Sequence, residues 1–315
     1  MIEADADMSA PENRVQISRA DYKAALTGFD AAVCEALAVS QASANRMASP
    51  NVGYASYVFA QMCGAGTSMV RAAPYSRWVH SDSQDWRFGA VAGHARSLLD
   101  GVLLLNYLME PASSDDELQA RLTVMHLNDC TRRIEMHQKI GAVDDLERFE
   151  LQRAELIQRL AGNSYFNALS ASVQKNCRNG RFLTIHTRDE MLAKLGFDKG
   201  HFDSMYDLWS QHIHILPVAF YRMEPNGRGT GLENDTDRAY IANALVVCTA
   251  VLSDTTDLMV KHFPDTAGVR QGVKSKFSPG PASNRPRGGR TAMPGDSFAL
   301  KQSSLSTSVK KTWEG

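Results

Sequence analysis

Apolar residues recur every three to four positions through most of this chain, which is the spacing at which a helix buries one face. The longest unbroken case runs from 86 to 109, and additional leucines widen its apolar stripe. The stripe consists of Phe88, Val91, Ala95, Leu98, Val102, Leu105 and Met109. We expect a central helix that stops at Pro111, because proline inside a helix removes a hydrogen bond and clashes with the preceding turn. The pattern predicts an all-α fold, a multi-helix bundle.

Helix-capping signals mark where several of these helices begin. Ser114 and Glu117 are spaced as a capping box, as are Thr187 and Glu190, and Ser18 is suited to open the first helix. In a capping box each of the two side chains accepts a hydrogen bond from the backbone N–H of the other residue. The sequence therefore predicts separate helices that start just after these positions.

Further helices are predicted from the apolar spacing between helix breakers. One runs from His201 to Leu216 and stops before Pro217, since proline disfavours helical backbone at the preceding residue. The last helix starts at Asp235 or Asp237 and ends near His262. Only residues 181–186 alternate in the manner of a strand, and this run is short.

Composition divides the chain into three parts. Residues 1–15 are acidic, polar and without periodicity, so we expect a disordered N-terminus. Residues 16–265 make up the predicted helical bundle, and residues 266–315, rich in Gly, Pro, Ser, Lys and Arg, a disordered basic tail. Residues 268–315 carry nine Lys and Arg against two acids, although the whole chain has a formal net charge of -1. RNA or another anion is therefore a candidate partner of the tail, bound without specificity.

Several classes of site and location are disfavoured. The longest apolar stretch, 241–252, is about 12 residues, whereas a membrane-spanning helix needs about 20. Because the acidic start is also unlike a signal peptide, we expect a cytoplasmic protein without membrane insertion. The five cysteines are widely spaced and form no CxxC motif, which indicates reduced thiols. No metal-binding or phosphate-binding motif is found, so neither a metal nor a cofactor is expected.

Polar side chains at helical spacing mark the first candidate site. Arg96 and Asp100 are one turn apart in the most apolar helix, and Tyr206, Ser210 and His214 share one face of a later helix. A hydroxyl beside an imidazole is typical of a nucleophile with its base, although no nucleophile-elbow motif surrounds this serine. The alternative is structural: an ion pair and a core histidine belong to a buried polar network that fixes the helix register.

Arg132 and His137 are the second candidate pair. They lie five positions apart in the helix that follows Ser114. With Asn128 and Glu135 nearby, the same segment also fits a solvated charged face that carries no chemistry.

The first site carries a family resemblance. The segment from His94 to Tyr107 contains Arg-x-x-x-Asp and a leucine-rich run, and the segment from Tyr206 to His214 contains Tyr-x-x-x-Ser-x-x-x-His just before Pro217. In this order, over about 86–220, they resemble a bacterial all-helical family of unknown function, in which Glu is commoner than the Asp found at position 100. That family is similar in style to the HEPN group of helical bundles.

The HEPN resemblance implies an activity. Many HEPN proteins are metal-independent ribonucleases with an Arg-x4–6-His motif at a dimer interface, and Arg132 to His137 fits this spacing, with Arg133 in place of the usual polar residue. The resemblance implies that an imidazole takes the proton of a ribose 2′-OH while an arginine stabilises charge on the phosphate. Arg96 and His214 would serve equally if their helices pack together. The HEPN resemblance also implies a homodimer.

Three functions follow from these features. The first is a non-enzymatic cytosolic binding module with a buried polar network, for which His214→Ala lowers the melting temperature. The second is a HEPN-type endoribonuclease in phage defence or stress response, for which the same change removes cleavage and leaves folding intact. The third is a nucleic-acid-binding accessory protein, for which truncation at about Ala267 removes a salt-sensitive association and spares the fold.

Overall fold

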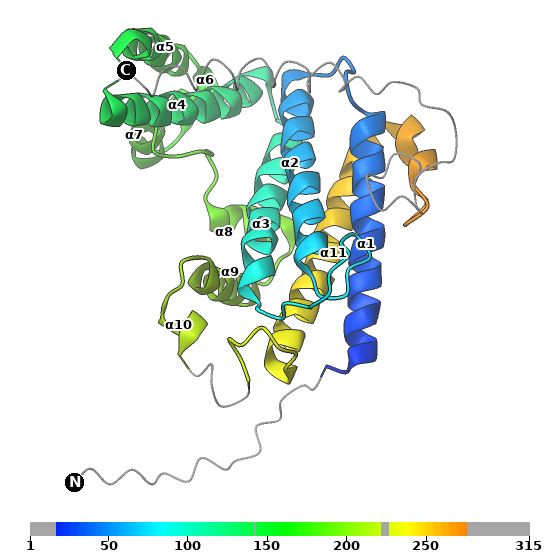
Figure 1. Cartoon of the computed structure of the whole chain (residues 1–315). Coiled ribbons are helices and arrows are strands. Elements are labelled where there is room, and N and C mark those ends of the chain that lie inside the picture. The colour runs from blue at the N-terminus through cyan, green and yellow to red at the C-terminus, as the bar shows by residue number, and fades with distance from the viewer. Residues whose placement is uncertain (1–16, 142, 222–226, 276–315) are drawn as a thin grey trace, which may run out of the picture.

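The computed structural model describes residues 17–141, 143–221 and 227–275 (Figure 1). Regular structure in this part of the chain is entirely helical, which confirms the all-α prediction. The α-helices are followed by one 3-10 helix, and in chain order they are α1 (Arg19–Ala42), α2 (Pro50–Ala72), α3 (Gly89–Met109), α4 (Asp115–Ile140), α5 (Val143–Ala161), α6 (Ser164–Ala168), α7 (Ala171–Arg178), α8 (Arg188–Leu195), α9 (Lys199–Ile213), α10 (Pro217–Phe220), α11 (Asp235–His262) and η2 (Pro264–Val269).

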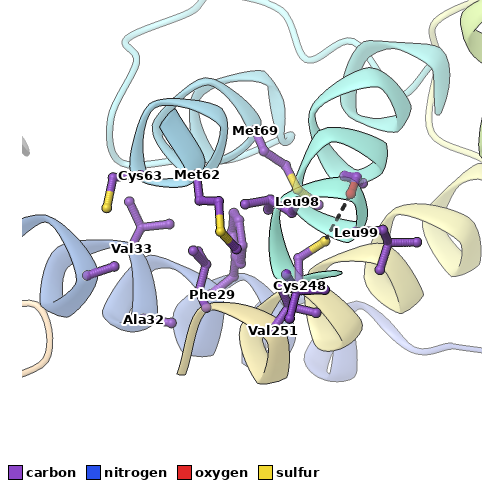
Figure 2. Packing of buried hydrophobic residues seen from close by; sticks show 14 of the residues in the cluster. Phe29, Ala32, Val33, Met62, Cys63, Met69, Leu98, Leu99, Cys248 and Val251 are labelled. Atoms are coloured by element: carbon purple, nitrogen blue, oxygen red, sulfur yellow. Dashed lines mark hydrogen bonds between the residues drawn. The ribbon is translucent and has the colours of Figure 1, made fainter. Parts of the chain in front are cut away.

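Four long helices form the main bundle. Helix α1 packs on α2 and α11, and α3 packs on α2 and α11, so the four enclose one interior (Figure 1). Figure 2 shows Phe29, Met62, Leu98 and Cys248, one from each helix, within this interior. Each of these side chains is at most 2% exposed. Burial of such a side chain stabilises the fold by about 1.5–3 kcal/mol, so the apolar stripes of the sequence account for the core.

Helices α2 and α3 approach closely at one glycine. A Cβ atom on Gly101 would lie 2.6 Å from the Cγ of Met62. That distance is far inside ordinary van der Waals contact, so a larger residue here would force the Met62 side chain or the helix to move. The small residue at this position therefore permits the tight packing of α3, which carries the first candidate site.

A second, smaller core lies where α4 crosses the end of the main bundle (Figure 1). It is formed by α4, α5, α6 and α7, and its most buried members include Leu127, Leu160, Phe166 and Cys177. Leu122, on another face of α4, belongs to the main core. Helix α4 therefore joins the two cores, because it is apolar on more than one side.

Residues 181–186 do not form the strand that their alternation predicts. The segment is irregular, and the Ile185 N–H bonds to the Tyr107 hydroxyl at 3.1 Å. The Ile185 side chain is 5% exposed and packs in the second core. Alternation of apolar and polar residues shows only that one side of a segment is buried, and a connecting segment that lies across a core has this property too. A strand also needs a neighbouring strand whose backbone groups pair with its own.

One predicted capping box is complete and the other is half formed. Thr187 and Glu190 each accept the backbone N–H of the other, as expected. Ser114 accepts the Glu117 N–H, but the Glu117 carboxylate bonds to the N–H and hydroxyl of Ser113. The helix still begins at the predicted place. The Glu117 carboxylate accepts the N–H one residue earlier than expected, and the backbone donors of the first turn remain satisfied.

The predicted start of the tail at 266 is wrong. Residues 264–269 form η2, which packs on α1, and the Gly272 N–H bonds to Glu35 at 2.8 Å. The Ser275 side chain is fully buried. Arg270, counted among the tail's cations, donates to Glu35 at 2.9 Å and to Asp257. Acidic partners on α1 and α11 therefore hold this basic stretch in the fold. The predicted disordered segments 1–15 and 276–315 lie outside the described residues.

Helix α11 is the one helix in the described part of the chain whose length and composition would allow it to cross a membrane. Half of its most apolar stretch is buried inside the bundle, where it contacts α1, α2 and α3. Core helices of bundles pass the same test of length and hydropathy, so this feature has little weight for a membrane location.

Candidate functional site

The crossing of α3 and α9 brings together side chains that are far apart in the sequence (Figure 1). The Arg96 guanidinium on α3 donates from Nη1 to Ser210 Oγ at 2.6 Å and from Nη2 to the Tyr206 hydroxyl. Its Cζ lies 3.3 Å from the centroid of the Tyr206 ring, a cation–π contact. The Arg96 side chain is 20% exposed, so these charge-assisted bonds form where water competes little. We call Arg96, Asp100, Tyr206 and Ser210 the Arg96 clamp.

Asp100 is the outer member of the Arg96 clamp. Its Oδ2 lies 3.3 Å from Arg96 Nε, and its side chain is 53% exposed. An ion pair that is half in water is worth roughly 0–1 kcal/mol. Arg96 Nε is buried and makes no hydrogen bond among the described residues. The predicted Arg96–Asp100 pair is therefore present, but the stronger contacts of Arg96 are those to α9.

The sequence of α9 explains why two of its polar groups face α3. Phe202 and Trp209 are buried in the main core, seven positions apart and therefore on one face. Tyr206 stacks on Phe202, with ring centroids 5.9 Å apart, and Ser210 follows one turn later. Burial of the two aromatic side chains thus fixes the rotation of α9 and turns Tyr206 and Ser210 toward Arg96.

The geometry gives Ser210 a structural role. Its hydroxyl donates to the Tyr206 carbonyl at 2.6 Å and accepts from Arg96, so its proton is already used. Among the described residues, neither an imidazole nor a carboxylate bonds to this hydroxyl. A nucleophilic serine needs such a base to take its proton. The arrangement can hold two helices together, and it lacks the parts of a nucleophile with its base.

His214 lies outside the Arg96 clamp, which corrects the predicted Tyr206–Ser210–His214 face. Helix α9 ends at Ile213 and not at Leu216, so His214 is the C-cap residue. Its side chain is exposed, and only its backbone N–H bonds to Ser210, at 3.1 Å. Among the described residues no hydrogen bond or ion pair joins His214 to Arg96, so the second arginine–histidine pairing implied by the HEPN resemblance is also not assembled.

The histidine that does pack inward is His212. Its ring lies edge-on to Phe88, with centroids 4.8 Å apart, and its Nε2 is buried without a hydrogen-bond partner in the described structure. Burial, with the nearby Arg228 guanidinium, lowers the pKa of His212. The imidazole is therefore a neutral packing group at pH 7, which is the core-histidine role that the sequence reading had assigned to His214.

The end of α9 contains a strained residue. The Leu216 N–H bonds to the Gln211 carbonyl at 2.9 Å, which closes the helix as a Schellman motif. The residue between cap and closure, Ile215, adopts φ 52°, the left-handed conformation that this motif usually gives to glycine. For a β-branched residue this costs on the order of 1–2 kcal/mol. Strained backbone of this kind is concentrated at functional sites, where a particular side chain is needed for binding or catalysis.

An uncovered apolar surface surrounds the strained residue. Large hydrophobic side chains are exposed in close succession, with Ile215 at 74% and Tyr221 at 64%. We call this set the apolar turn, and it consists of Ile213, Ile215, Leu216, Val218, Phe220 and Tyr221. Clustered apolar side chains at the surface of a folded protein mark an interaction site more often than an isolated one does. The sequence reading assigned no role to this segment, although its run of hydrophobic residues beside Pro217 was the available signal.

Arg132 and His137 are not brought together. Five positions along a helix turn side chains roughly 140° apart. Arg132 is 58% exposed and bonds to Glu135 at 3.1 Å, as the solvated-face alternative predicts. His137 packs on Phe149 of α5, with ring centroids 5.3 Å apart. The pair fits the spacing of the HEPN motif, but its two side chains do not share a site within one chain.

Metal and thiol chemistry find no support in the described residues. No group of three or more His, Cys, Asp or Glu in this part of the chain is arranged to hold a metal ion. All five cysteines are buried, and none forms a disulfide. Burial raises the pKa of Cys63 to about 12 and of Cys177 to about 11. Because the thiolate is the reactive form, these two side chains are inert at neutral pH.

Sequence reasoning also missed a buried ion pair at the start of α4. Arg121 is 4% exposed, and it bonds to the carboxylate of Glu117 one turn earlier. Its Nη1 donates to the Glu110 carbonyl at 3.0 Å, and its Cζ lies 5.4 Å from the Tyr107 ring centroid. The spacing of four residues was visible, but it is equally typical of exposed pairs. Only the burial of both side chains distinguishes this ion pair from an exposed pair at the same spacing.

Comparisons with protein-family models, with curated proteins and with solved structures found no match.

Proposed function

We propose that this chain is a non-enzymatic interaction module that pairs with a second copy of itself through the apolar turn. The observation that carries the proposal is the set of exposed hydrophobic side chains at 213–221, placed at the end of a helix that the Arg96 clamp holds on the bundle. Desolvation of such side chains on association is favourable by roughly 25 cal/mol per Å².

The Arg96 clamp supports this function because it fixes the position of the apolar turn. Helix α9 packs on α3, and α10 packs on α9. Ile213 also lies close to the main bundle, since a Cβ on Gly93 would be 3.9 Å from its Cγ1. A surface held in one place loses little conformational entropy on binding, so its affinity is higher than that of a mobile loop.

The strain at Ile215 supports an interaction role. Glycine in this position would close the helix without the cost of a left-handed β-branched residue. The fold by itself therefore gains nothing from isoleucine here, because the side chain is 74% exposed and contributes little to the core. A hydrophobic contact with a partner would account for it.

The charge of the apolar turn favours a second copy as the partner. In a symmetric dimer the same patch meets itself across a two-fold axis, so like charges in the patch would repel. Residues 213–221 include no Lys, Arg, Asp or Glu. Because the turn is small compared with a standard interface, we expect a weak dimer with a dissociation constant in the micromolar range.

Sedimentation velocity of the full chain over about 1–100 µM tests the proposal. We expect a concentration-dependent shift from monomer to dimer for the wild type. Phe220→Asp, which places a charge in the apolar turn, should abolish the shift. Leu232→Asp is the matched control, because Leu232 is 71% exposed but lies outside the turn.

Ile215→Gly separates association from folding. This change removes the left-handed strain and an exposed side chain together, so we expect a higher melting temperature and a weaker dimer. A wild-type chain that stays monomeric at the highest concentration would contradict the proposal. So would a dimer that Phe220→Asp and Leu232→Asp weaken equally.

A further inference from the structure

A cleft of about 600 Å³ opens at the end of the main bundle beside the second core. Its walls are the start of α2, the end of α3 with the α3–α4 connection, α8, and the end of α11. Volumes of about 300–1,000 Å³ are typical of sites for small molecules. None of the members of the Arg96 clamp or of the apolar turn lines this cleft.

The floor of the cleft is apolar. Val52 and Leu103 are 7% and 6% exposed, and they belong to the main core. Leu195 and Leu258 also line the cleft and are half-buried. These side chains come from α2, α3, α8 and α11, so the apolar floor is continuous across four helices. A hydrocarbon or aromatic group would be desolvated there.

One carboxylate lines the cleft, and basic groups already surround it. Glu110 Oε1 lies 2.7 Å from the Lys194 ammonium, and its Oε2 lies 3.6 Å from Arg121 Nη2 and 3.9 Å from His186 Nε2. Among the described residues that line the cleft, Glu110 is the sole acid. Its negative charge is therefore balanced within the protein and is not available to a cationic ligand.

Positive charge remains at the mouth of the cleft. Lys261 is exposed at the end of α11, lines the cleft, and forms no ion pair in the described structure. His262 is its neighbour and lines the cleft as well. An unpaired ammonium beside an apolar floor complements a molecule with an anionic head and an apolar body.

We infer that this cleft binds a small amphipathic anion, a carboxylate with an apolar body, with the carboxylate at Lys261 and the body over Val52, Leu103 and Leu258. This ligand class satisfies both properties of the cleft at once, because its body is removed from water and its head meets the uncompensated cation. A cationic or doubly anionic molecule satisfies at most one of them.

Isothermal titration calorimetry of the full chain tests the inference with two probes of closely similar tail length. Decanoate carries the anionic head, and decyltrimethylammonium carries a cationic head. We expect saturable binding of one decanoate per chain and at least about tenfold weaker binding of decyltrimethylammonium, because like charges meet at Lys261. A tenfold difference is the scale of a single favourable charge contact in a partly desolvated place.

Three variants locate the bound decanoate. Lys261→Gln should weaken binding roughly threefold to tenfold, since it removes the cation at the mouth. Ala112→Trp should block binding, because Ala112 lines the cleft from the connection between α3 and α4, where a large ring fills space without entering a core. Lys23→Gln is the matched control, since Lys23 is an exposed lysine on α1 that does not line the cleft.

Either of two results overturns the inference once circular dichroism shows that the variants are folded. One is the absence of saturable decanoate binding to the wild type. The other is binding that survives Ala112→Trp, which would place the decanoate outside the cleft, or binding that decyltrimethylammonium matches, which would show that the charge of the head has no effect. Loss of dimerisation in Phe220→Asp leaves this test unchanged, so the two proposals fail separately.

Discussion

The guanidinium of Arg96 donates to the hydroxyl of Ser210 at 2.6 Å, across 114 positions of sequence. This bond, with the one to Tyr206, joins α9 to the central helix of the bundle. Arg96→Met keeps an unbranched apolar stem and removes both bonds. We expect it to lower the free energy of unfolding by about 1–3 kcal/mol, measured by urea denaturation. Arg96→Lys should recover only part of this loss, because an ammonium cannot reproduce the fork of a guanidinium.

His214→Ala should leave the melting temperature unchanged. The side chain is exposed and forms no hydrogen bond or ion pair in the described structure. The buried polar network expected from the sequence, with His214 as a member, predicts a lower melting temperature instead. Arg132→Ala should likewise change the free energy of unfolding by no more than about 0.5 kcal/mol. A marked loss of stability in His214→Ala, without one in Arg132→Ala, would show that His214 does belong to the polar network.

Arg121→Met should be the most destabilising of the charge-removing substitutions. Glu117 is 8% exposed in its side chain, and without Arg121 its carboxylate would stay buried without a counter-ion. Breaking a buried pair in this way costs about 3–5 kcal/mol. The double variant Arg121→Met with Glu117→Gln should recover part of the loss, because no unpaired charge is left behind. Urea denaturation of both variants provides the comparison.

Truncation should affect the fold only when it passes into residues 266–275. A chain that ends after Ser275 keeps the bonds from Arg270 to Glu35 and Asp257. A chain that ends after Thr266 loses them, and we expect its free energy of unfolding to be lower by about 1–3 kcal/mol. Any nucleic-acid binding by the tail must therefore be tested with the chain that ends after Ser275, because truncation at Ala267 changes the fold as well. Equal melting temperatures of the two chains would contradict this account.

Stability should fall as the pH is lowered below neutral. Burial and Arg228 lower the pKa of His212 from the usual 6.5, against an opposing effect of Asp237. The unfolded chain then binds a proton at higher pH than the folded chain, so His212 stabilises the fold above pH 6.5 and this contribution is lost as the pH falls through the folded pKa. The pKa values of His94 and His186 are lowered by burial too. Thermal unfolding at about pH 7.5 and pH 5.5 should show the loss.

His212→Gln isolates one histidine in that measurement. We expect a smaller change of melting temperature between the two pH values than in the wild type, whatever the absolute stability of the variant. His214→Ala is the control and should keep the full change, because His214 is exposed. An unchanged pH dependence in His212→Gln would show that His212 does not contribute to it.

The sequence by itself determined the features that depend on local periodicity. Apolar residues at helical spacing in 86–109 define α3 within a few residues, and Thr187 with Glu190 fixes the start of α8. Both signals act over one or two turns of helix, so they do not depend on what the helix packs against. The all-α class follows from them.

Tertiary structure alone decided the partners of the polar groups. Arg96 could be paired with Asp100 from the sequence, but its bonds to α9 depend on how Phe202 and Trp209 rotate that helix into the core. A helix end three residues earlier than expected moved His214 out of the site and exposed the apolar turn. Burial and long-range contacts are properties of the packed chain, and no short window of sequence contains them.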